Sequence, residues 1–217
     1  MSAVQEAPSP GGVLYRIGRK PAPLAWPPWE LTGAERFDDL ERRFRTLYAA
    51  TQRIGCFLEA LAPLRPRPEA MAKWKAIHGP EAYPPQPIAR GWHEQRAMAY
   101  LRLTRPVRLL DVRAITTCAF LRGELAVTLD ALHLPDLDPS MVRGPHRHLT
   151  QAIAAWAHEH GFGGIAYRSR FDDGLEYVLD CWALFEGTEF EGVGPWDEIT
   201  RDDLDLRTAA SLHGLAL

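Results

Sequence analysis

The chain has 217 residues, of which 46% are hydrophobic, and this length favours one substantial core over two. The formal net charge is −3 without a long run of like charge, which excludes an electrostatic basis for binding duplex nucleic acid or an anionic membrane. The three scattered cysteines and the lack of a bilayer-length apolar run indicate a single-domain cytoplasmic protein with reduced thiols, which binds neither nucleic acid nor membrane directly.

The chain begins with a stretch of small and polar residues that is rich in proline and glycine. Residues 1–12, "MSAVQEAPSPGG", are therefore predicted to be a disordered tail, and the catalytic domain is expected to occupy 13–217. "VLYRIGR", residues 13–19, predicts the first strand. The many prolines of 20–44 predict a long loop.

A strand is expected at 45–50, followed directly by a helix at 51–62. Thr51 is positioned to cap the free amides of this helix. The apolar stripe of the helix runs along one face, and Glu59 lies away from it among small neighbours. The residues of that stripe are Ile54, Leu58 and Leu61.

The proline-rich segment 63–91 is expected to hold one short helix over 68–77, beginning with Pro68. Residues 96–104 and 107–113 are expected to form two strands, or one strand with a sharp corner at Arg105-Pro106. Helical patterns return after them, and a C-terminal hairpin closes the pattern. The remaining expected elements are helical segments at 114–132 and 149–161, with Gly161 as the stop, and strands at 164–169 and 176–185 around a turn at 172–174. Strands and helices mixed without regular alternation predict the α+β class.

Four histidines near the 149–161 helix invite a metal-site interpretation. His146 and His148 precede the helix and His158 and His160 lie at its far end, which separates the two pairs by about 15 Å. One ion cannot be held by both pairs, so we expect no metal site. A Gly-x-Ser-x-Gly elbow, a Gly-x-Gly-x-x-Gly turn and a P-loop are also absent from the sequence.

A different set of polar residues is distributed through the predicted elements. It comprises Arg16 in "YRIGR", Arg36 in "AERFDD", Tyr48 in "TLYAA", Glu59 in "CFLEAL" and Ser169 in "YRSR". Each residue alone has an ordinary structural explanation, as a surface arginine, a core tyrosine, a solvated carboxylate or a strand-end hydroxyl. Their joint order and surroundings indicate a site.

In this order the chain resembles the RES-domain family over about residues 13–187. The resemblance is carried by "LYRIGR", "ERFDD…RTLYAATQRIGCFLEAL", "LTQAIAAWAHEHGFGGIAYRSR" and "CWALFE". It implies a single compact domain with an ADP-ribosyltransferase-like fold, a mixed sheet with flanking helices. It also implies a toxin of a toxin–antitoxin system that destroys NAD, partnered by an Xre-type or related antitoxin. The family's arginine, glutamate and serine match Arg16 or Arg36, Glu59 and Ser169, and its tyrosine matches Tyr48.

The residue types fit cleavage of the nicotinamide–ribose bond. Glu59 would stabilise an oxocarbenium-like transition state, as carboxylates do in glycoside cleavage. Arg16 and Arg36 would hold the pyrophosphate and an incoming phosphate, and the sequence does not say which does which. Tyr48 would stack on a ring of NAD, and Ser169 would orient the nicotinamide ribose or amide. No cofactor is expected, because NAD is the substrate and phosphate the co-substrate.

Two departures from the family pattern leave alternatives open. Ala34-Glu35-Arg36-Phe37 stands where many members have Gly-Gly-Arg-Trp. Thr150, near the start of a predicted helix, is the reserve candidate for the hydroxyl of Ser169. Arg168 or Arg170 is expected to help hold the anionic groups. Strand alternation would place both on the face opposite Ser169, which would make at least one of them structural.

The competing functions are a protein ADP-ribosyltransferase, a RES-like binding module without activity, and a hydrolase that depends on histidine. The resemblance favours phosphorolysis of NAD. The sequence does not separate NAD degradation from ADP-ribosylation of a protein, because loops such as 20–44 and 63–91 set the acceptor pocket. A homodimer is one interpretation of Trp26, Trp29 and Trp92 in predicted loops; the alternative is that they close the core or the cleft.

Overall fold

The computed structural model describes residues 4–80, 83–89, 91–172 and 178–217. Its strands are β1 (Glu6–Ala7), β2 (Leu14–Arg19), β3 (Thr46–Ala50), β4 (Gln86–Pro87), β5 (Arg96–Leu103), β6 (Leu109–Asp111), β7 (Gly164–Arg168), β8 (Asp180–Phe185), β9 (Phe190–Gly192), β10 (Asp197–Glu198) and β11 (Leu215–Ala216). Its helices are α1 (Arg53–Leu61), α2 (Pro68–His78), α3 (Ile115–Glu124), α4 (Ala126–Ala131), α5 (Pro139–Arg143), α6 (Arg147–Glu159) and α7 (Leu204–Leu212), with 3-10 turns at Trp29–Leu31 and Ala62–Leu64. None of these helices is long and apolar enough to cross a bilayer.

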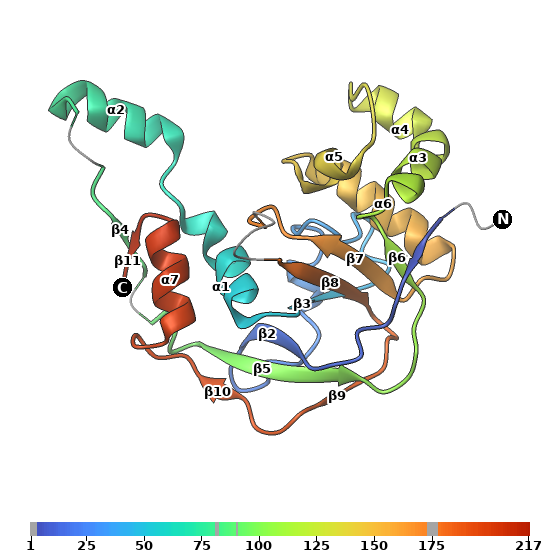
Figure 1. Ribbon diagram of the computed structural model, residues 1–217, viewed down its shortest axis with the longest axis horizontal. Coiled ribbons are helices and arrows are strands. Elements are labelled where there is room, and N and C mark those ends of the chain that lie inside the picture. The colour runs from blue at the N-terminus through green and yellow to red at the C-terminus, as the bar shows by residue number, and fades with distance from the viewer. Residues whose placement is uncertain (1–3, 81–82, 90, 173–177) are drawn as a thin grey trace.

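One mixed sheet organises the domain (Figure 1). Its strand order is β1-β6-β7-β8-β3-β2-β5-β10, with β9 added beside β5. The pairing of β6 with β7 is parallel, whereas the other pairs in this sheet are antiparallel. Short β4 and β11 pair separately in parallel. The α+β class expected from the sequence is confirmed.

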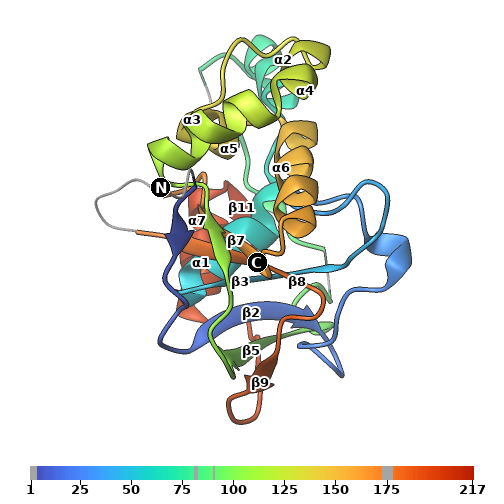
Figure 2. The same cartoon turned by 90° about the vertical axis from the view of Figure 1, so that its right-hand side faces the viewer.

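Two groups of helices pack against the sheet and leave a seam between them. Helices α3 to α6 lie over β6, β7 and β8, where they share a core with residues such as Ile165 and Ala183 (Figures 1 and 2). Helices α1 and α7 contact each other and share a second core with Met98 of β5. Inward-facing side chains of β3 and β7, Tyr48 and Tyr167, lie between these groups. The seam therefore exposes one face of the sheet to a cavity.

The sheet opens at the junction of β2 and β3. These strands share a single register pair, Tyr15 with Ala50, whereas β2 pairs with β5 over its whole length. The loop after β2 crosses the strand so closely that a Cβ on Gly18 would lie 1.9 Å from the Pro23 carbonyl oxygen. Only glycine fits this approach, which places the Pro23 carbonyl beside Arg16.

Most predicted elements are found at or near their expected positions. The strands at 13–19, 45–50, 96–104 and 107–113 correspond to β2, β3, β5 and β6, and the helix at 149–161 corresponds to α6. Gly161 ends α6 with a φ of +75°, as its role as a stop requires. The hairpin of β7 and β8 is present, while the predicted turn at 172–174 lies largely outside the described residues.

Two local predictions are wrong. The cap position of α1 is Gln52, without a side-chain cap, because the Thr51 hydroxyl donates to the Asp180 carbonyl at 3.2 Å instead. The tail prediction for 4–12 fails because Glu6–Ala7 pairs with β6, Ala7 is buried, and Glu6 forms an ion pair with Arg108 at 2.9 Å. Residues 1–3 lie outside the described part of the chain.

Candidate active site in the seam of the sheet

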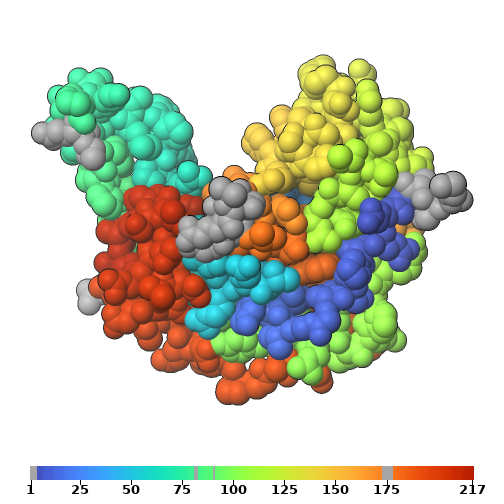
Figure 3. Space-filling model, viewed as in Figure 1, coloured from blue at the N-terminus to red at the C-terminus, as the bar shows by residue number. Residues whose placement is uncertain are grey.

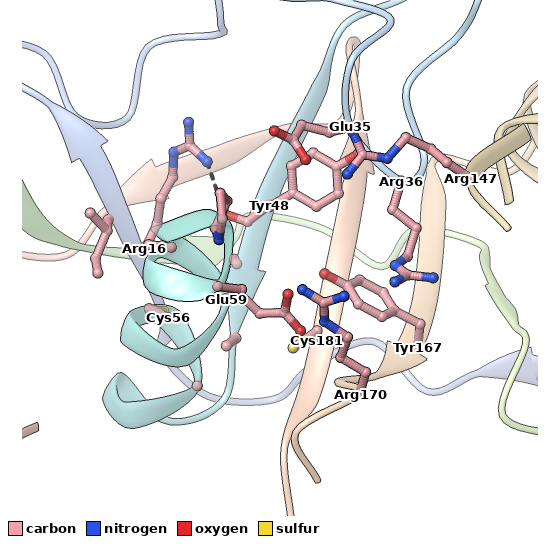
Figure 4. A pocket seen from close by; sticks show the side chains of 17 residues that line it. Arg16, Glu35, Arg36, Tyr48, Cys56, Glu59, Arg147, Tyr167, Arg170 and Cys181 are labelled. Carbon is pink, nitrogen blue, oxygen red and sulfur yellow. Dashed lines mark hydrogen bonds between the residues drawn. The ribbon is translucent and has the colours of Figure 1, made fainter. Parts of the chain in front are cut away.

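A cavity of about 330 Å³ occupies the seam. Arg16, Arg36, Tyr48 and Glu59 line it, although they come from β2, the loop before β3, β3 itself and α1. Figure 4 shows Glu59 and Arg170 extending into the same space as the ring of Tyr167. The volume lies at the lower end of the range for small-molecule sites. Four of the five predicted site residues therefore meet at one cavity.

Ser169 is the fifth predicted residue, and it acts behind the cavity instead of lining it. Its side chain is fully buried, and its hydroxyl donates to Glu59 Oε1 at 2.6 Å. Ser169 Oγ in turn accepts a hydrogen bond from the Phe171 amide at 3.1 Å. A serine hydroxyl has one proton to donate, and Glu59 takes it. The expected direct contact with a ribose is thus replaced by a contact that orients the Glu59 carboxylate.

Arg16 spans the opening between β2 and β3. Its Nε donates to the Pro23 carbonyl at 3.1 Å and its Nη1 donates to the Tyr48 carbonyl at 2.9 Å. Within the described part of the chain, no carboxylate lies within ion-pair distance of it. Burial lowers the pKa of Arg16 to about 10, against the opposing influence of Cys56 and Tyr48. The guanidinium is charged at neutral pH, and its Nη2 remains for an anion.

Arg36 is held in a similar way by main-chain oxygens. Its Nη1 donates to the carbonyls of Val142 at 2.7 Å and Gly144 at 2.8 Å, at the turn between α5 and α6. Burial lowers the pKa of Arg36, Glu59 opposes that shift, and the charges of Arg170 and Arg147 add to it. The guanidinium is thus anchored along one edge, which leaves its other donors for a ligand.

The segment that ends at Arg36, residues 33–36, is a strip of backbone held by hydrogen bonds from side chains of the first two turns of α6. Gln151 Nε2 donates to the carbonyls of residues 33 and 35, both at 3.0 Å. The Thr150 hydroxyl donates to the Arg36 carbonyl at 2.5 Å, and Arg147 donates to the carbonyl of residue 34. Each of the four carbonyls in this backbone strip is therefore bonded to α6.

These contacts change the interpretation of Thr150. The residue is fully buried inside α6, whose N-cap is His146, and it does not line the cavity. Thr150 therefore supports Arg36 and does not replace Ser169. The same contacts explain how this chain holds its arginine without the Gly-Gly-Arg-Trp sequence, because α6 side chains fix the turn.

Tyr48 joins the other edge of the strip to the sheet. Its hydroxyl accepts the Phe37 amide at 2.9 Å and donates to Asp38 Oδ1 at 2.9 Å. Asp38 Oδ2 accepts two amides of the strip, from residues 33 and 35, at 3.0 and 2.9 Å. Burial and the Asp38 charge raise the pKa of Tyr48 well above its usual value. The phenol is neutral and fixed, and its ring forms part of the cavity wall.

The sequence prediction left three polar cavity residues out of the site: Glu35, Arg147 and Tyr167. Tyr167 lies two residues before Ser169 in β7, so strand alternation could have found it. Of the two arginines predicted to hold anionic groups, Arg170 lines the cavity and Arg168 does not. Strand alternation would have placed Arg170 on the opposite face, but β7 ends at Arg168 and the chain turns. Arg168 instead lies 3.5 Å from both Asp172 and Asp180. Arg147 is simply the first residue of α6 and carried no signal in the sequence.

The cavity has a surplus of positive charge. Its lining contains four arginines, Arg16, Arg36, Arg147 and Arg170, and two glutamates, Glu35 and Glu59. Counting one charge for each gives +4 and −2, hence a surplus of +2. No ion pair joins any of these arginines to a carboxylate of the described residues. Such a site is suited to an anionic ligand with planar recognition of its oxygens.

Among the described residues, no histidine lines the cavity. His158 stacks on Phe44 at 4.3 Å and His160 stacks on Trp156 at 3.9 Å. Over the described ranges, no group of three or more His, Cys, Asp or Glu residues is placed to hold a metal ion.

Comparison with known proteins identifies the class. The family model described as "RES domain" matches residues 13–201, and the chain therefore belongs to the RES-domain family. Among solved structures, a chain of the M. tuberculosis MbcT–MbcA toxin–antitoxin complex matches with a TM-score of 0.52 and 12% sequence identity. The alignment covers 96% of this chain and 92% of that one. The expected ADP-ribosyltransferase-like fold is confirmed by this match. No curated protein matches the sequence.

Proposed function

We propose that the protein is an NAD-degrading enzyme that cleaves the nicotinamide–ribose bond and serves as the toxin of a toxin–antitoxin system. Membership of the RES-domain family supports consumption of NAD, and the similarity to a chain of a toxin–antitoxin complex supports an antitoxin partner. The proposal depends mainly on the orientation and position of the Glu59 carboxylate. This carboxylate is oriented by a buried serine and lines a cavity with four arginines that lack carboxylate partners among the described residues.

The chemistry needs an anionic group beside a sugar that becomes cationic. As the bond breaks, nicotinamide leaves with the electron pair and C1′ of the ribose acquires oxocarbenium character. Glu59 stabilises this charge without becoming covalently attached, and Ser169 keeps its carboxylate in one orientation. Tyr48 and Tyr167 provide aromatic walls for the nicotinamide ring.

The arginines bind the phosphates. Arg16 and Arg36 each use part of the guanidinium to reach backbone carbonyls, so each is oriented before substrate arrives. The positive nicotinamide ring of NAD cancels part of the negative charge of its pyrophosphate. NAD therefore neutralises only part of the positive charge surplus of the cavity lining. The remaining positive charge favours inorganic phosphate over water as the acceptor of the ADP-ribosyl group.

The antitoxin is proposed to be of the Xre or related kind and to block the cleft. Transfer of ADP-ribose to a protein side chain is the second candidate, since residues outside helices and strands, such as Glu35 and Arg170, line part of the cavity. A binding module without activity is the third.

The test is nicotinamide release from NAD by the purified protein, followed by chromatography with and without phosphate. We expect release that depends on phosphate, ADP-ribose 1″-phosphate as the second product, and loss of release in Glu59→Gln. Glu35→Gln is the matched control, because Glu35 also lines the cavity but is exposed and does not contact Ser169.

Each alternative gives its own result. Equal release in both buffers, with free ADP-ribose as product, would indicate hydrolysis. A mass increment on a co-incubated protein would indicate ADP-ribosyl transfer to protein. Absence of nicotinamide release under every condition would refute the enzyme and leave the binding module.

A further inference from the structure

The four arginines of the cavity fall into two groups. Tyr48 separates Arg16 from the other three in Figure 4. Burial lowers the pKa of Arg36 most, and among the smaller influences the positive charges of Arg170 and Arg147 act in the same direction. Both charges therefore lie close to Arg36. These three side chains, Arg36, Arg147 and Arg170, are here called the arginine cluster.

The arginine cluster lacks the carboxylate partners that hold arginines elsewhere in the chain. Arg113, for example, forms ion pairs with two aspartates at 2.8 and 2.9 Å. Within the described ranges, no carboxylate lies within ion-pair distance of any member of the cluster. Arg36 and Arg147 instead donate to main-chain carbonyls, and Arg170 lies over the Phe171 ring at 4.8 Å. Because three like charges repel one another in this arrangement, an anion bound between them would stabilise it.

The cluster extends to the mouth of the cavity. Arg147 and Arg170 are exposed, whereas Arg16 is half-buried. Another exposed lining residue, Pro63, lies in the turn before α2, and Arg147 begins α6 just after α5. Figure 3 shows that the surface is notched between α2 and the yellow helices of the other lobe. A small anion therefore reaches the cluster from solvent without passing Arg16.

We propose that the arginine cluster is the subsite for the phosphate that accepts the ADP-ribosyl group, while Arg16 binds the pyrophosphate of NAD. This inference rests on the proposed NAD-degrading function. Inorganic phosphate is a dianion whose oxygens pair with the planar donors of guanidinium groups, and the cluster offers more than one such group. Arg16 has a single guanidinium, of which two nitrogens are already bonded to the carbonyls of Pro23 and Tyr48. Its remaining donor suits the pyrophosphate, in which each phosphate group carries a single negative charge.

The proposed step conserves atoms and charge. An oxygen of the bound phosphate forms a bond to C1′ of the ribose while the bond from C1′ to nicotinamide breaks. The electron pair of that bond leaves with nicotinamide, which becomes neutral. The proton of hydrogen phosphate remains on the new phosphate ester, which releases it to water at neutral pH. Glu59 and Arg170 extend into the same space (Figure 4), so the stabilised ribose and the bound phosphate meet there.

Arg170→Gln and Arg147→Gln test the subsite through steady-state nicotinamide release at varied concentrations of phosphate and NAD. Each variant is expected to raise the KM for phosphate about tenfold or more, because a bond to a charged group is lost, while the KM for NAD stays within about twofold of the wild type. Arg170→Lys keeps the charge but loses the planar fork, so its KM for phosphate should lie between those of the wild type and Arg170→Gln. Arg102→Gln is the matched control, because Arg102 is an exposed arginine of β5 outside the cavity, and both constants should be unchanged.

Two kinetic results overturn the proposal. A raised KM for NAD with an unchanged KM for phosphate would mean that the cluster binds the pyrophosphate. An unchanged KM for phosphate in either glutamine variant would refute a subsite made of three arginines. Circular dichroism of each variant establishes that it is folded.

Calorimetric titration with inorganic phosphate alone separates failure of the subsite from failure of the proposed function. If the wild type releases nicotinamide, the kinetic constants decide. If it releases none, the proposed function fails and the titration decides on the subsite. Phosphate binding by the wild type and Arg102→Gln that is at least about tenfold weaker in Arg170→Gln would support the subsite. Equal affinity in all three proteins, or no binding by the wild type, would overturn it.

Discussion

Replacing Ser169 by alanine tests whether the buried hydroxyl acts through Glu59. The substitution removes a hydrogen bond of 2.6 Å to a carboxylate and leaves both the carboxylate and the Phe171 amide without that partner. Hydrogen bonds to charged groups contribute about 1.5–3 kcal/mol. If that energy is realised in the transition state, kcat falls about 10- to 150-fold, because about 1.4 kcal/mol corresponds to a factor of ten. The KM for NAD should change little, since Ser169 does not line the cavity.

The assay is steady-state nicotinamide release, measured below the unfolding temperature of each variant. Ser140→Ala is the matched control, because the Ser140 hydroxyl also donates to a carboxylate, that of Asp138, at 2.6 Å, and does so outside the cavity. Its kcat should equal that of the wild type. This control separates the loss of a hydroxyl–carboxylate bond in general from the loss of this one.

A double-mutant cycle decides whether Ser169 has a role of its own. If the hydroxyl acts only by orienting the carboxylate, Ser169→Ala causes no further loss of kcat in a Glu59→Gln background. Full additivity of the two losses would refute this reasoning, as would a kcat for Ser169→Ala within twofold of the wild type. Additivity would mean that the hydroxyl contacts the substrate after a rearrangement.

Three further predictions concern the supports of the site. Gly18→Ala should lower the unfolding temperature markedly, because the added Cβ would overlap the Pro23 carbonyl. Gly123→Ala in α3 is the control: its Cβ meets nothing within 4 Å, and alanine should stabilise the folded protein by about 0.5–1 kcal/mol. Equal effects of the two substitutions on thermal unfolding would contradict the close approach at Gly18. Because burial lowers the pKa of Arg16 to about 10, the KM for NAD should rise as the pH increases through 10 and the guanidinium loses its charge. Arg16→Gln should start from a high KM without that dependence, and a similar pH profile in this variant would count against the role of Arg16. Gln151→Leu frees two carbonyls of the 33–36 strip and should raise the KM more than it lowers kcat, and an unchanged KM would show that the strip holds Arg36 without Gln151.

Elements with local signals were predictable from the sequence. The buried strand predicted at 164–169, the apolar stripe of 149–161 and the left-handed stop at Gly161 depend on neighbouring residues and are found at or near their expected positions. The tail failed for the opposite reason. Glu6–Ala7 has no strand signal of its own and is ordered by an ion pair with Arg108 and by pairing with β6, more than 100 residues away.

The site residues likewise differ in whether the sequence alone could place them. Arg16, Arg36, Tyr48 and Glu59 were found by their order along the chain, and the fold brings them to one cavity. Arg147 was missed and Arg170 was placed on the wrong face, because their positions depend on where α6 begins and where β7 ends, which sequence patterns locate only within a few residues. An error of one residue at the end of β7 is enough to turn Arg170 to the other face of the sheet.

The role of the hydroxyl follows from the same geometry. As a strand-end residue, Ser169 was expected to contact a ligand, but its hydroxyl donates to Glu59 of α1. The nearest acceptor is therefore a carboxylate on another element and not the substrate. The sequence motif indicates that an arginine, a glutamate and a serine act at one site, but it does not say which of them line the cavity. In the folded chain Glu59 and the arginines line it, whereas Ser169 is buried and donates a hydrogen bond to Glu59.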